Sequence, residues 1–339
     1  MKQKIIFRAD GNSDIGLGHI MRLLALAEML KNNFLISFAI QNANSSIAEM
    51  LQPYCNEIIS LPVQVNYIEE AHFFSKNYIE PKDLVVLDGY HFKSEYQRIL
   101  KKSCKKLIYI DDLHDWHQYA DVVINHAMSV SPNDYSKEAY TQTLLGLKYA
   151  LLRPVFFEKK ELNSDDSTLQ KIFVSMGGAD VHNISGKVMS ALSSMEEIKK
   201  VYVLVGKVNQ HNYDLPKDSN FEIKNNLSSV EICNLLRECQ LAICPASTTA
   251  IEACAIGIGI LSGYTANNQM DILKSLEKNN CIINMGNLLD VSENEIIENI
   301  TGLFKSKNQL NSMKIAQSNI IDGKSPNRFL ELFNKLSDA

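Results

Sequence analysis

The chain has 339 residues, of which 45% are hydrophobic and 22% are charged, and its formal net charge is −5. This length is enough for two domains, and the acidic balance argues against a nucleic-acid-binding surface. No apolar run is long enough to span a membrane or to act as a secretory signal, so we expect a cytoplasmic protein with neither a nucleic acid nor a membrane as partner. The seven cysteines form no C-x-x-C pair, which is typical of reduced thiols in a cytosolic protein.

Short apolar runs alternate with helix-like segments along nearly the whole chain. In the first half, strands are expected at 5–8, 34–40, 58–61, 84–88, 107–110 and 122–124. Helices are expected directly after the first strand and at 45–53, 67–77 and 94–102. In the second half, strands are expected at 171–175, 201–205, 221–223, 241–244, 259–261 and 282–283. The helices between them are expected at 183–194, 229–238, 249–256 and 269–279.

Strands that are apolar on both faces, with helices between them, are typical of parallel sheets that are covered on both sides. We therefore predict an α/β protein with two doubly wound, Rossmann-like parallel-sheet domains. The first spans residues 1–155 and the second 156–322, with a polar, acidic linker near 154–170. Residues 323–339 are expected to form a final helix that begins near Pro326. Ligands of such sheets bind at the carboxyl ends of the strands.

The first strand leads into the turn "RADGNSDIGLGHIMR", residues 8–22, which contains Gly16, Gly18 and His19. A glycine turn that opens a helix presents backbone N–H groups to an anion, and the helix dipole favours that anion. The turn lacks the dinucleotide-binding fingerprint, because Met21 stands where the third glycine would be. The glycines would also suit a simple tight bend with a locally bonded histidine. The density of polar residues in this connection favours chemistry by the histidine next to a phosphate. These residues are Arg8, Asp10, Asn12, Ser13, Asp14 and Arg22.

Three segments of the second half combine glycines, hydroxyls and amides at helix starts. The Gly-Gly turn of "SMGGAD" lets the backbone approach a phosphate closely. In "CPASTTAIEACAIGIG" the hydroxyls at a helix N terminus can form a diphosphate cradle, although one of them would equally serve as an ordinary N-cap. A glutamate one turn further on can accept both ribose hydroxyls, and "NNQ" adds amides at the same sheet edge. The residues expected to meet on one ligand are Gly177, Gly178, Ser247, Thr248, Thr249, Glu252, Asn268 and Gln269.

The segments "VLDGY" and "YIDDLHDWH" each follow a predicted strand of the first half, so their polar side chains are expected at the sheet edge that carries His19. Carboxylates and imidazoles of the second segment can also ligate a metal, but their spacing matches no known metal motif, and we expect no metal site. The side chains expected at this edge are Asp88, Tyr90, Asp111 and Asp112. Histidines in solvated loops are expected at His114, His117 and His126.

Six segments, taken in order, resemble one enzyme family. They are "FRADGNSDIGLGHIMRLLALAEML", "LDGYHF", "LLGLKYALLRPVF", "SMGGAD", "STTAIEA" and "NNQ". Together they resemble the UDP-2,4-diacetamido-2,4,6-trideoxy-β-L-altropyranose hydrolases of pseudaminic acid biosynthesis. That family is similar in fold to the two-domain GT-B glycosyltransferases, particularly the one that adds N-acetylglucosamine to lipid II. The resemblance covers roughly residues 4–280 and implies a GT-B arrangement with an interdomain cleft and a C-terminal helix that crosses back to the first domain.

The resemblance implies hydrolysis of that UDP-sugar with neither a metal nor a cofactor, in which water displaces UDP at the anomeric carbon with inversion. His19 would lie beside that carbon, either as general base or as the group that orients the water, and Tyr90 would contact the sugar or the water. Asp10 is expected to orient His19 as in a dyad. An inverting glycosyltransferase of the same fold and a non-catalytic UDP-sugar-binding protein are the alternatives, and the oligomeric state is left open. Further residues expected in the substrate site are Arg8, Gly16 and Gly18, together with those of the second half.

Overall fold

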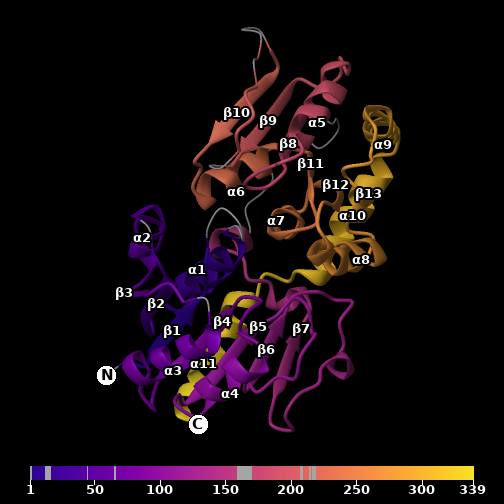
Figure 1. Ribbon diagram of the computed structural model, residues 1–339. Helices are drawn as coiled ribbons and strands as arrows, with labels where there is room; N and C mark the ends of the chain where they lie inside the picture. Colours follow the sequence, from indigo (N-terminus) through magenta and orange to yellow (C-terminus); the bar gives the residue numbers. More distant parts are fainter. Residues whose placement is uncertain are drawn as a thin grey trace. The chain divides into compact units, whose positions relative to one another are not determined.

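The computed structural model of the chain describes residues 2–11, 17–43, 45–64, 66–158, 170–206, 209–213, 215 and 219–339. The chain divides into two compact units (Figure 1). The first unit comprises Met1–Pro154 together with Lys324–Ala339, and the second comprises Val155–Gly323. The end of the chain therefore belongs to the same unit as its beginning. No helix in the part of the chain that the structure describes combines the length and the apolarity needed to cross a bilayer.

The first unit is built on a seven-stranded parallel sheet with the strand order β3-β2-β1-β4-β5-β6-β7. Its strands are β1 (Lys4–Arg8), β2 (Leu35–Gln41), β3 (Glu57–Leu61), β4 (Leu84–Asp88), β5 (Lys106–Ile110), β6 (Val122–Asn125) and β7 (Gln142–Leu145). Its helices are α1 (Gly18–Leu30), α2 (Ser45–Leu51), α3 (Tyr67–Tyr78), α4 (Ser94–Lys101) and α11 (Ser325–Asp338). Short 3-10 turns lie at η1 (Gln52–Tyr54), η2 (Pro132–Asp134) and η3 (Leu147–Tyr149).

The second unit has a six-stranded parallel sheet with the order β10-β9-β8-β11-β12-β13. Its strands are β8 (Lys171–Ser175), β9 (Lys200–Val205), β10 (Phe221–Asn225), β11 (Leu241–Pro245), β12 (Gly259–Tyr264) and β13 (Ile283–Asn287). Its helices are α5 (Ile184–Ser193), α6 (Ser229–Glu238), α7 (Thr248–Ile256), α8 (Met270–Lys278), α9 (Glu293–Lys305) and α10 (Lys307–Ile320). Short 3-10 turns lie at η4 (Pro154–Phe157) and η5 (Asn267–Gln269).

In both sheets the strand order changes direction at the first strand of the unit, so that later strands are added on its other side. β1 pairs with β2 on one side and with β4 on the other, and β8 likewise pairs with β9 and β11. Open parallel sheets bind ligands at such switch points, beyond the carboxyl ends of the strands. β7 was not expected from the sequence, and its four residues, QTLL, continue the sheet parallel to β6.

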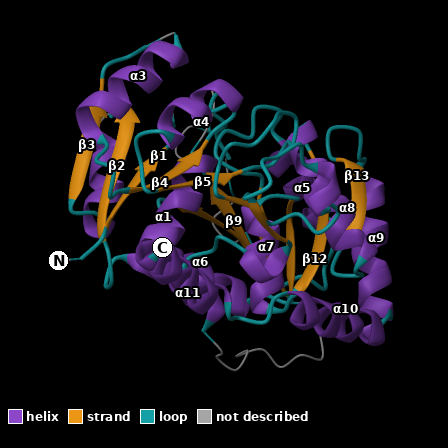
Figure 2. Cartoon of the chain, turned by 90° about the horizontal axis from the view of Figure 1, so that it is seen from below, coloured by secondary structure: helices purple, strands orange, loops and turns teal. Residues whose placement is uncertain are grey.

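The first sheet is covered on both faces, and alternate residues of its strands enter different cores. Ile5 and Phe7 of β1 pack in the core that includes α1 and α11, whereas Ile6 packs in the core that includes α3 and α4. Figure 2 shows these two pairs of helices on opposite sides of the strands. Two aromatic rings of α11, Phe329 and Phe333, are fully buried in the first of these cores. The alternation decides which polar residue at a strand end faces which helix layer.

Candidate active site

The first cluster of polar side chains lies where β4 ends and α1 begins. His19 is the second residue of α1, and Arg22 lies one turn further along the same helix. Both side chains are buried, with exposed fractions of 7% each. Asp88, the last residue of β4, is fully buried beneath them. Gly18 begins the helix, whereas Gly16 falls outside the described residues.

His19 and Asp88 form a close buried pair. His19 Nδ1 lies 2.7 Å from Asp88 Oδ1. Because a carboxylate oxygen only accepts hydrogen bonds, Nδ1 is the donor in this contact, and in the neutral imidazole the lone pair is then on Nε2. A neutral histidine held in this tautomer can accept a proton at Nε2, which is the arrangement of a general base oriented by a carboxylate.

Arg22 binds two carboxylates at once. Its Nε and Nη2 donate to the two oxygens of Asp88, at 2.9 and 2.6 Å, and its Nη1 donates to Asp112 Oδ1 at 2.5 Å. Burial alone would lower the pKa of Arg22, but Asp112 and Asp88 raise it well above its usual value. The guanidinium is therefore a permanent positive charge between two carboxylates. Its Nη2 also lies 3.0 Å from His19 Nδ1, so all three groups meet at one point.

Asp112 connects Arg22 to Tyr90. Although burial would raise the pKa of the Asp112 carboxyl, Arg22 lowers it to about 2, so the group is ionised at neutral pH. The Tyr90 hydroxyl donates to Asp112 Oδ2 at 3.3 Å. The Tyr90 ring stands edge-on to His19, with 4.7 Å between the ring centroids and 83° between the ring planes. The structure thus places the rings of Tyr90 and His19 next to each other.

Asp10 and Arg8 belong to a different buried network, which corrects two expectations. The carboxylate bonded to His19 is Asp88, whereas both oxygens of Asp10 accept from Arg8, at 2.6 and 2.7 Å. Arg8 also donates to both oxygens of Glu70 on α3, at 2.9 and 2.8 Å, and weakly to the Ala39 carbonyl. With all five N–H groups engaged and no exposed surface, Arg8 has none left for a substrate. The cause is the strand period of two, which turns Arg8 and Asp10 toward α3 and away from α1.

The histidines after β5 and β6 fall in different surroundings. His114 and His117 are half-buried, and His117 bonds to Ser136 and to Glu138. His126 follows β6 and is only 6% exposed, so the expectation of a solvated loop histidine was wrong for this residue. Burial and the nearby Arg22 lower the pKa of His126 to about 4, so the imidazole is neutral. Asp111 accepts N–H bonds from its own loop, at Leu113 and His114.

The loop after β5 therefore disperses the side chains that could have ligated a metal. Across the residues that the structure describes, no three His, Cys, Asp or Glu side chains gather in a way that could hold a metal ion. Asp112 is instead directed at Arg22, and His117 is directed at Glu138 on the far side of the loop.

In the second unit, the Gly-Gly turn follows β8 at the carboxyl edge of its sheet. Gly177 has a φ of +84°, a conformation that favours glycine. Gly178 lies so close to the end of β9 that a Cβ atom at Gly206 would overlap its carbonyl group. Asp180 accepts from the backbone N–H groups of Ile184 and Ser185 and so caps α5. A Cβ atom at Gly177 would meet no described atom within 4 Å, so this part of the turn is not packed against a neighbouring element.

The start of α7 lies at the same edge. Ser247 is the N-cap residue, but its side chain makes no capping hydrogen bond to the described chain and donates weakly to the Pro245 carbonyl. Its hydroxyl therefore does not take the place of an anion at the helix N terminus. Thr248 and Thr249 form the first turn, and Glu252 lies half-buried one turn further on.

The amides after β12 have two different environments. Gln269 accepts through Oε1 from the N–H and the hydroxyl of Thr265, at 2.7 and 3.3 Å, and so closes its own turn, whereas Asn268 is exposed. A cavity of about 720 Å³ lies beyond the ends of β9 and β10 at this carboxyl edge. Its lining is Val205, Gly206, Asn209, His211, Asn212, Tyr213, Ile223, Asn225 and Asn226.

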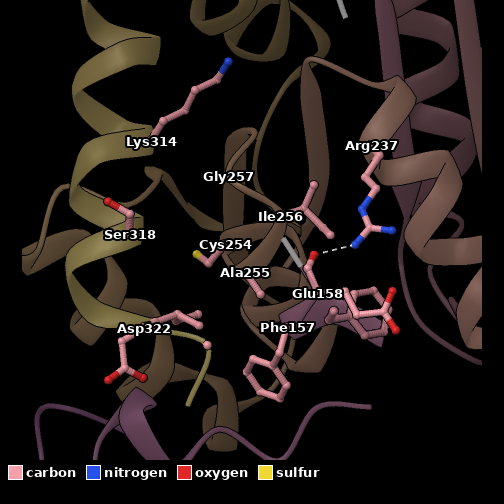
Figure 3. A pocket seen from close by; sticks show the side chains of 13 residues that line it. Phe157, Glu158, Arg237, Cys254, Ala255, Ile256, Gly257, Lys314, Ser318 and Asp322 are labelled. Carbon is pink, nitrogen blue, oxygen red and sulfur yellow. Dashed lines mark hydrogen bonds between the residues drawn. The ribbon is translucent and has the colours of Figure 1, made fainter. Parts of the chain in front are cut away.

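A second cavity in this unit, of about 510 Å³, lies at the opposite, amino ends of the strands (Figure 3). It lies where α6 and α7 end, and its lining includes Arg237, Ile256 and Gly257. The Arg237 guanidinium donates to the carbonyl of Glu158 at 2.8 Å, which Figure 3 shows as a dashed line, and to that of Val155 at 3.2 Å. The lining contains none of the residues expected to bind a ligand, so the cavity is separate from the candidate site.

No family model matches the chain. Uncharacterized protein MJ1062 of Methanocaldococcus jannaschii is 25% identical over 94% of this chain and 70% of that protein. The UDP-2,4-diacetamido-2,4,6-trideoxy-β-L-altropyranose hydrolase of Campylobacter jejuni is 26% identical over 74% of this chain and 87% of that enzyme. The spore coat polysaccharide biosynthesis protein SpsG of Bacillus subtilis is 24% identical over 93% of both proteins.

Solved structures of glycosyltransferases share the fold. The spinosyn forosaminyltransferase SpnP superimposes with a TM-score of 0.68 over 100% of both chains, at 11% identity. MurG of Acinetobacter baumannii superimposes with a TM-score of 0.64 over 99% of this chain and 100% of its own, at 14% identity. At these identities the likeness concerns the fold alone, and it confirms the predicted pair of parallel-sheet α/β domains of the GT-B glycosyltransferases.

Proposed function

We propose that this protein is a metal-independent hydrolase that releases UDP and the free sugar from UDP-2,4-diacetamido-2,4,6-trideoxy-β-L-altropyranose, a step of pseudaminic acid biosynthesis. The observation that carries the proposal is the buried pair of His19 and Asp88, 2.7 Å apart, which leaves His19 Nε2 as a base. The likeness to a hydrolase of this UDP-sugar in Campylobacter jejuni supports the choice of reaction.

In the proposed reaction His19 Nε2 takes a proton from a water molecule, whose oxygen bonds to the anomeric carbon. The bond between that carbon and the UDP oxygen breaks, and its electron pair leaves with UDP. Inversion requires the base on the face of the sugar opposite the leaving group. Asp88 holds the Nδ1–H tautomer and stabilises the imidazolium that forms. Tyr90, edge-on to the imidazole, contacts the sugar or positions the water.

The leaving group needs charge stabilisation more than it needs a proton, because UDP is already a stable anion. In this proposal the second domain, 156–322, binds UDP and the first, 1–155, carries the base. The turn at Gly177 and Gly178 and the first turn of α7 supply N–H and hydroxyl donors to the diphosphate. Glu252 accepts the ribose hydroxyls, and Asn268 and Gln269 complete the UDP-sugar site.

The test is release of UDP from the named UDP-sugar in the presence of EDTA and without an acceptor, with the anomer of the released sugar followed by NMR. We expect turnover with inversion. The His19→Asn variant should lose at least about 100-fold in kcat, because proton transfer by a positioned base contributes at least that much. The matched control is His72→Asn, which changes an exposed histidine of α3 and should keep full activity.

Two results would redirect the proposal. Binding of the UDP-sugar without release of UDP would mean that water is not the acceptor, and an inverting glycosyltransferase of the fold shared with the transferase SpnP would become the proposed function. Full activity of His19→Asn would remove His19 from the reaction even if hydrolysis occurred.

A further inference from the structure

Two carboxylates share one guanidinium beside His19. Arg22 donates to both oxygens of Asp88 and to one oxygen of Asp112. Since one positive charge stands against two negative charges, one negative charge stays uncompensated next to a neutral imidazole. When the imidazole takes up a proton, the cluster becomes neutral. Asp112 is the second carboxylate on the guanidinium, and it therefore accounts for the uncompensated negative charge beside the imidazole.

We propose that Asp112 is a positioning residue that sets the basicity of His19 through Arg22 and holds Tyr90 against the imidazole. The inference rests on the proposed function, in which His19 is the base. It goes beyond the pairing of His19 with Asp88, because Asp88 orients the ring but has most of its charge offset by Arg22. Asp112 restores that charge without touching the ring.

Four further titratable groups face this cluster, and none of them compensates the extra negative charge. His126 after β6 is neutral, because burial and Arg22 lower its pKa to about 4. Burial raises the pKa of Tyr109 on β5 well above its usual value, so that phenol is neutral as well. Burial also raises the pKa of Asp111, whose carboxyl is bonded to the amides of its own loop. His91 after β4 stacks on Tyr67, and burial lowers its pKa.

Asp112 also has a geometric role. Its two oxygens accept from different partners, Oδ1 from Arg22 and Oδ2 from the Tyr90 hydroxyl. Arg22 and Tyr90 stand on different elements, α1 and the loop after β4, and each contacts His19. One carboxylate after β5 therefore connects two of the groups that contact the imidazole. Its loss should loosen the tyrosine as well as change the charge.

The experiment is a titration of His19 by NMR in protein with ¹³C-labelled histidine, assigned by the signal that disappears in His19→Asn. It needs no substrate. In Asp112→Asn the midpoint for His19 should fall by roughly one pH unit, because a neighbouring negative charge is lost. In Arg22→Gln it should rise by a similar amount, and in the double variant it should return near the wild-type value. Asp111→Asn, the matched control one residue away, should leave it within a few tenths of a unit.

The same variants connect the charge to the reaction. In Asp112→Asn the acid limb of the pH profile of kcat/KM should move to lower pH by the same amount, while kcat falls about tenfold and KM changes little. An unchanged midpoint in Asp112→Asn, or an equal shift in Asp111→Asn, overturns the inference. If Asp112→Asn does not fold, the direction of the shift in Arg22→Gln decides. Failure of the wild type to release UDP would overturn the proposed hydrolysis but would leave the titration to decide the role of Asp112.

Discussion

At the scale of residues, His19 lies between two opposing electrostatic influences, the N terminus of α1 and the carboxylates of Asp88 and Asp112. A helix N terminus carries a partial positive charge and disfavours a protonated histidine. His19 is the second residue of α1 and therefore lies where this partial charge acts. In the proposed mechanism, the carboxylates of Asp88 and Asp112 oppose this effect and stabilise the imidazolium that forms. The helix and the carboxylates together fit a group that must accept a proton and then release it.

The tautomer of His19 can be tested at Asp88. In Asp88→Asn the amide can present an N–H to Nδ1, which favours the tautomer with the proton on Nε2 and removes the base. We expect kcat for UDP release to fall by about 10³–10⁴-fold with the fold retained. The matched control is Asp115→Asn at an exposed aspartate, which should be neutral. A fall of less than tenfold in Asp88→Asn would show that Asp88 does not hold the tautomer.

At the scale of elements, the sequence was sufficient for most of the strands because buried parallel strands are apolar on both faces. It failed at β7, where QTLL offers only two apolar residues at the edge of the sheet. Strand alternation contains the signal that would have identified the partner of His19. Val86 packs on the α1 side of the sheet and Leu87 on the other, so Asp88 returns to the α1 side, whereas Asp10 faces the α3 side.

Other features of the site had no signal in the sequence. Glu70 and His126 stand in segments without a recognisable motif, and the partner of Glu70 is distant in the chain. Glu70 pairs with Arg8 across 62 positions, and Arg22 joins Asp112 across 90. Such contacts depend on which strands become neighbours in the sheet. The expectation that Asp10 would be the carboxylate partner of His19 fails for this reason.

The close approach of Gly206 to the Gly-Gly turn can be tested by a substitution at Gly206. In Gly206→Ala the new Cβ would overlap the carbonyl of Gly178, so the turn after β8 must move. We expect the free energy of unfolding to fall by about 1–3 kcal/mol and, under the proposed function, UDP to bind at least tenfold more weakly. Thermal unfolding and calorimetric titration with UDP measure the two effects.

The control for this substitution is Gly302→Ala in α9. A Cβ there meets no atom of the described chain within 4 Å. Because alanine has the higher helix propensity, this variant should gain about 0.5–1 kcal/mol and bind UDP like the wild type. Unchanged UDP binding in Gly206→Ala, despite a loss of stability, would separate the Gly-Gly turn from the nucleotide site.

At the scale of the whole molecule, the last helix makes the first unit discontinuous in sequence. Ser325 at the start of α11 donates to the Ala150 carbonyl at 2.8 Å. Phe333 packs with its ring centroid 6.1 Å from that of Phe34, next to β2. The core of the first unit is therefore complete only when residues from both ends of the chain are in place. Folding of this unit requires a contact between segments about 300 residues apart, which costs more loop-closure entropy than a local contact.

This dependence predicts that the two units respond differently to one substitution. Phe333→Ala removes a fully buried ring from the core of the first unit and should cost about 3–5 kcal/mol of stability there. Amide hydrogen exchange should become faster in peptides of β1, α1 and β4, while peptides of β8, α5 and β11 keep their protection. Lys335→Ala, at an exposed position of the same helix, should change neither set. Equal loss of protection in both sets would mean that the units unfold as one cooperative body. Loss confined to the first set would mean that the second sheet retains its fold when the first core is weakened.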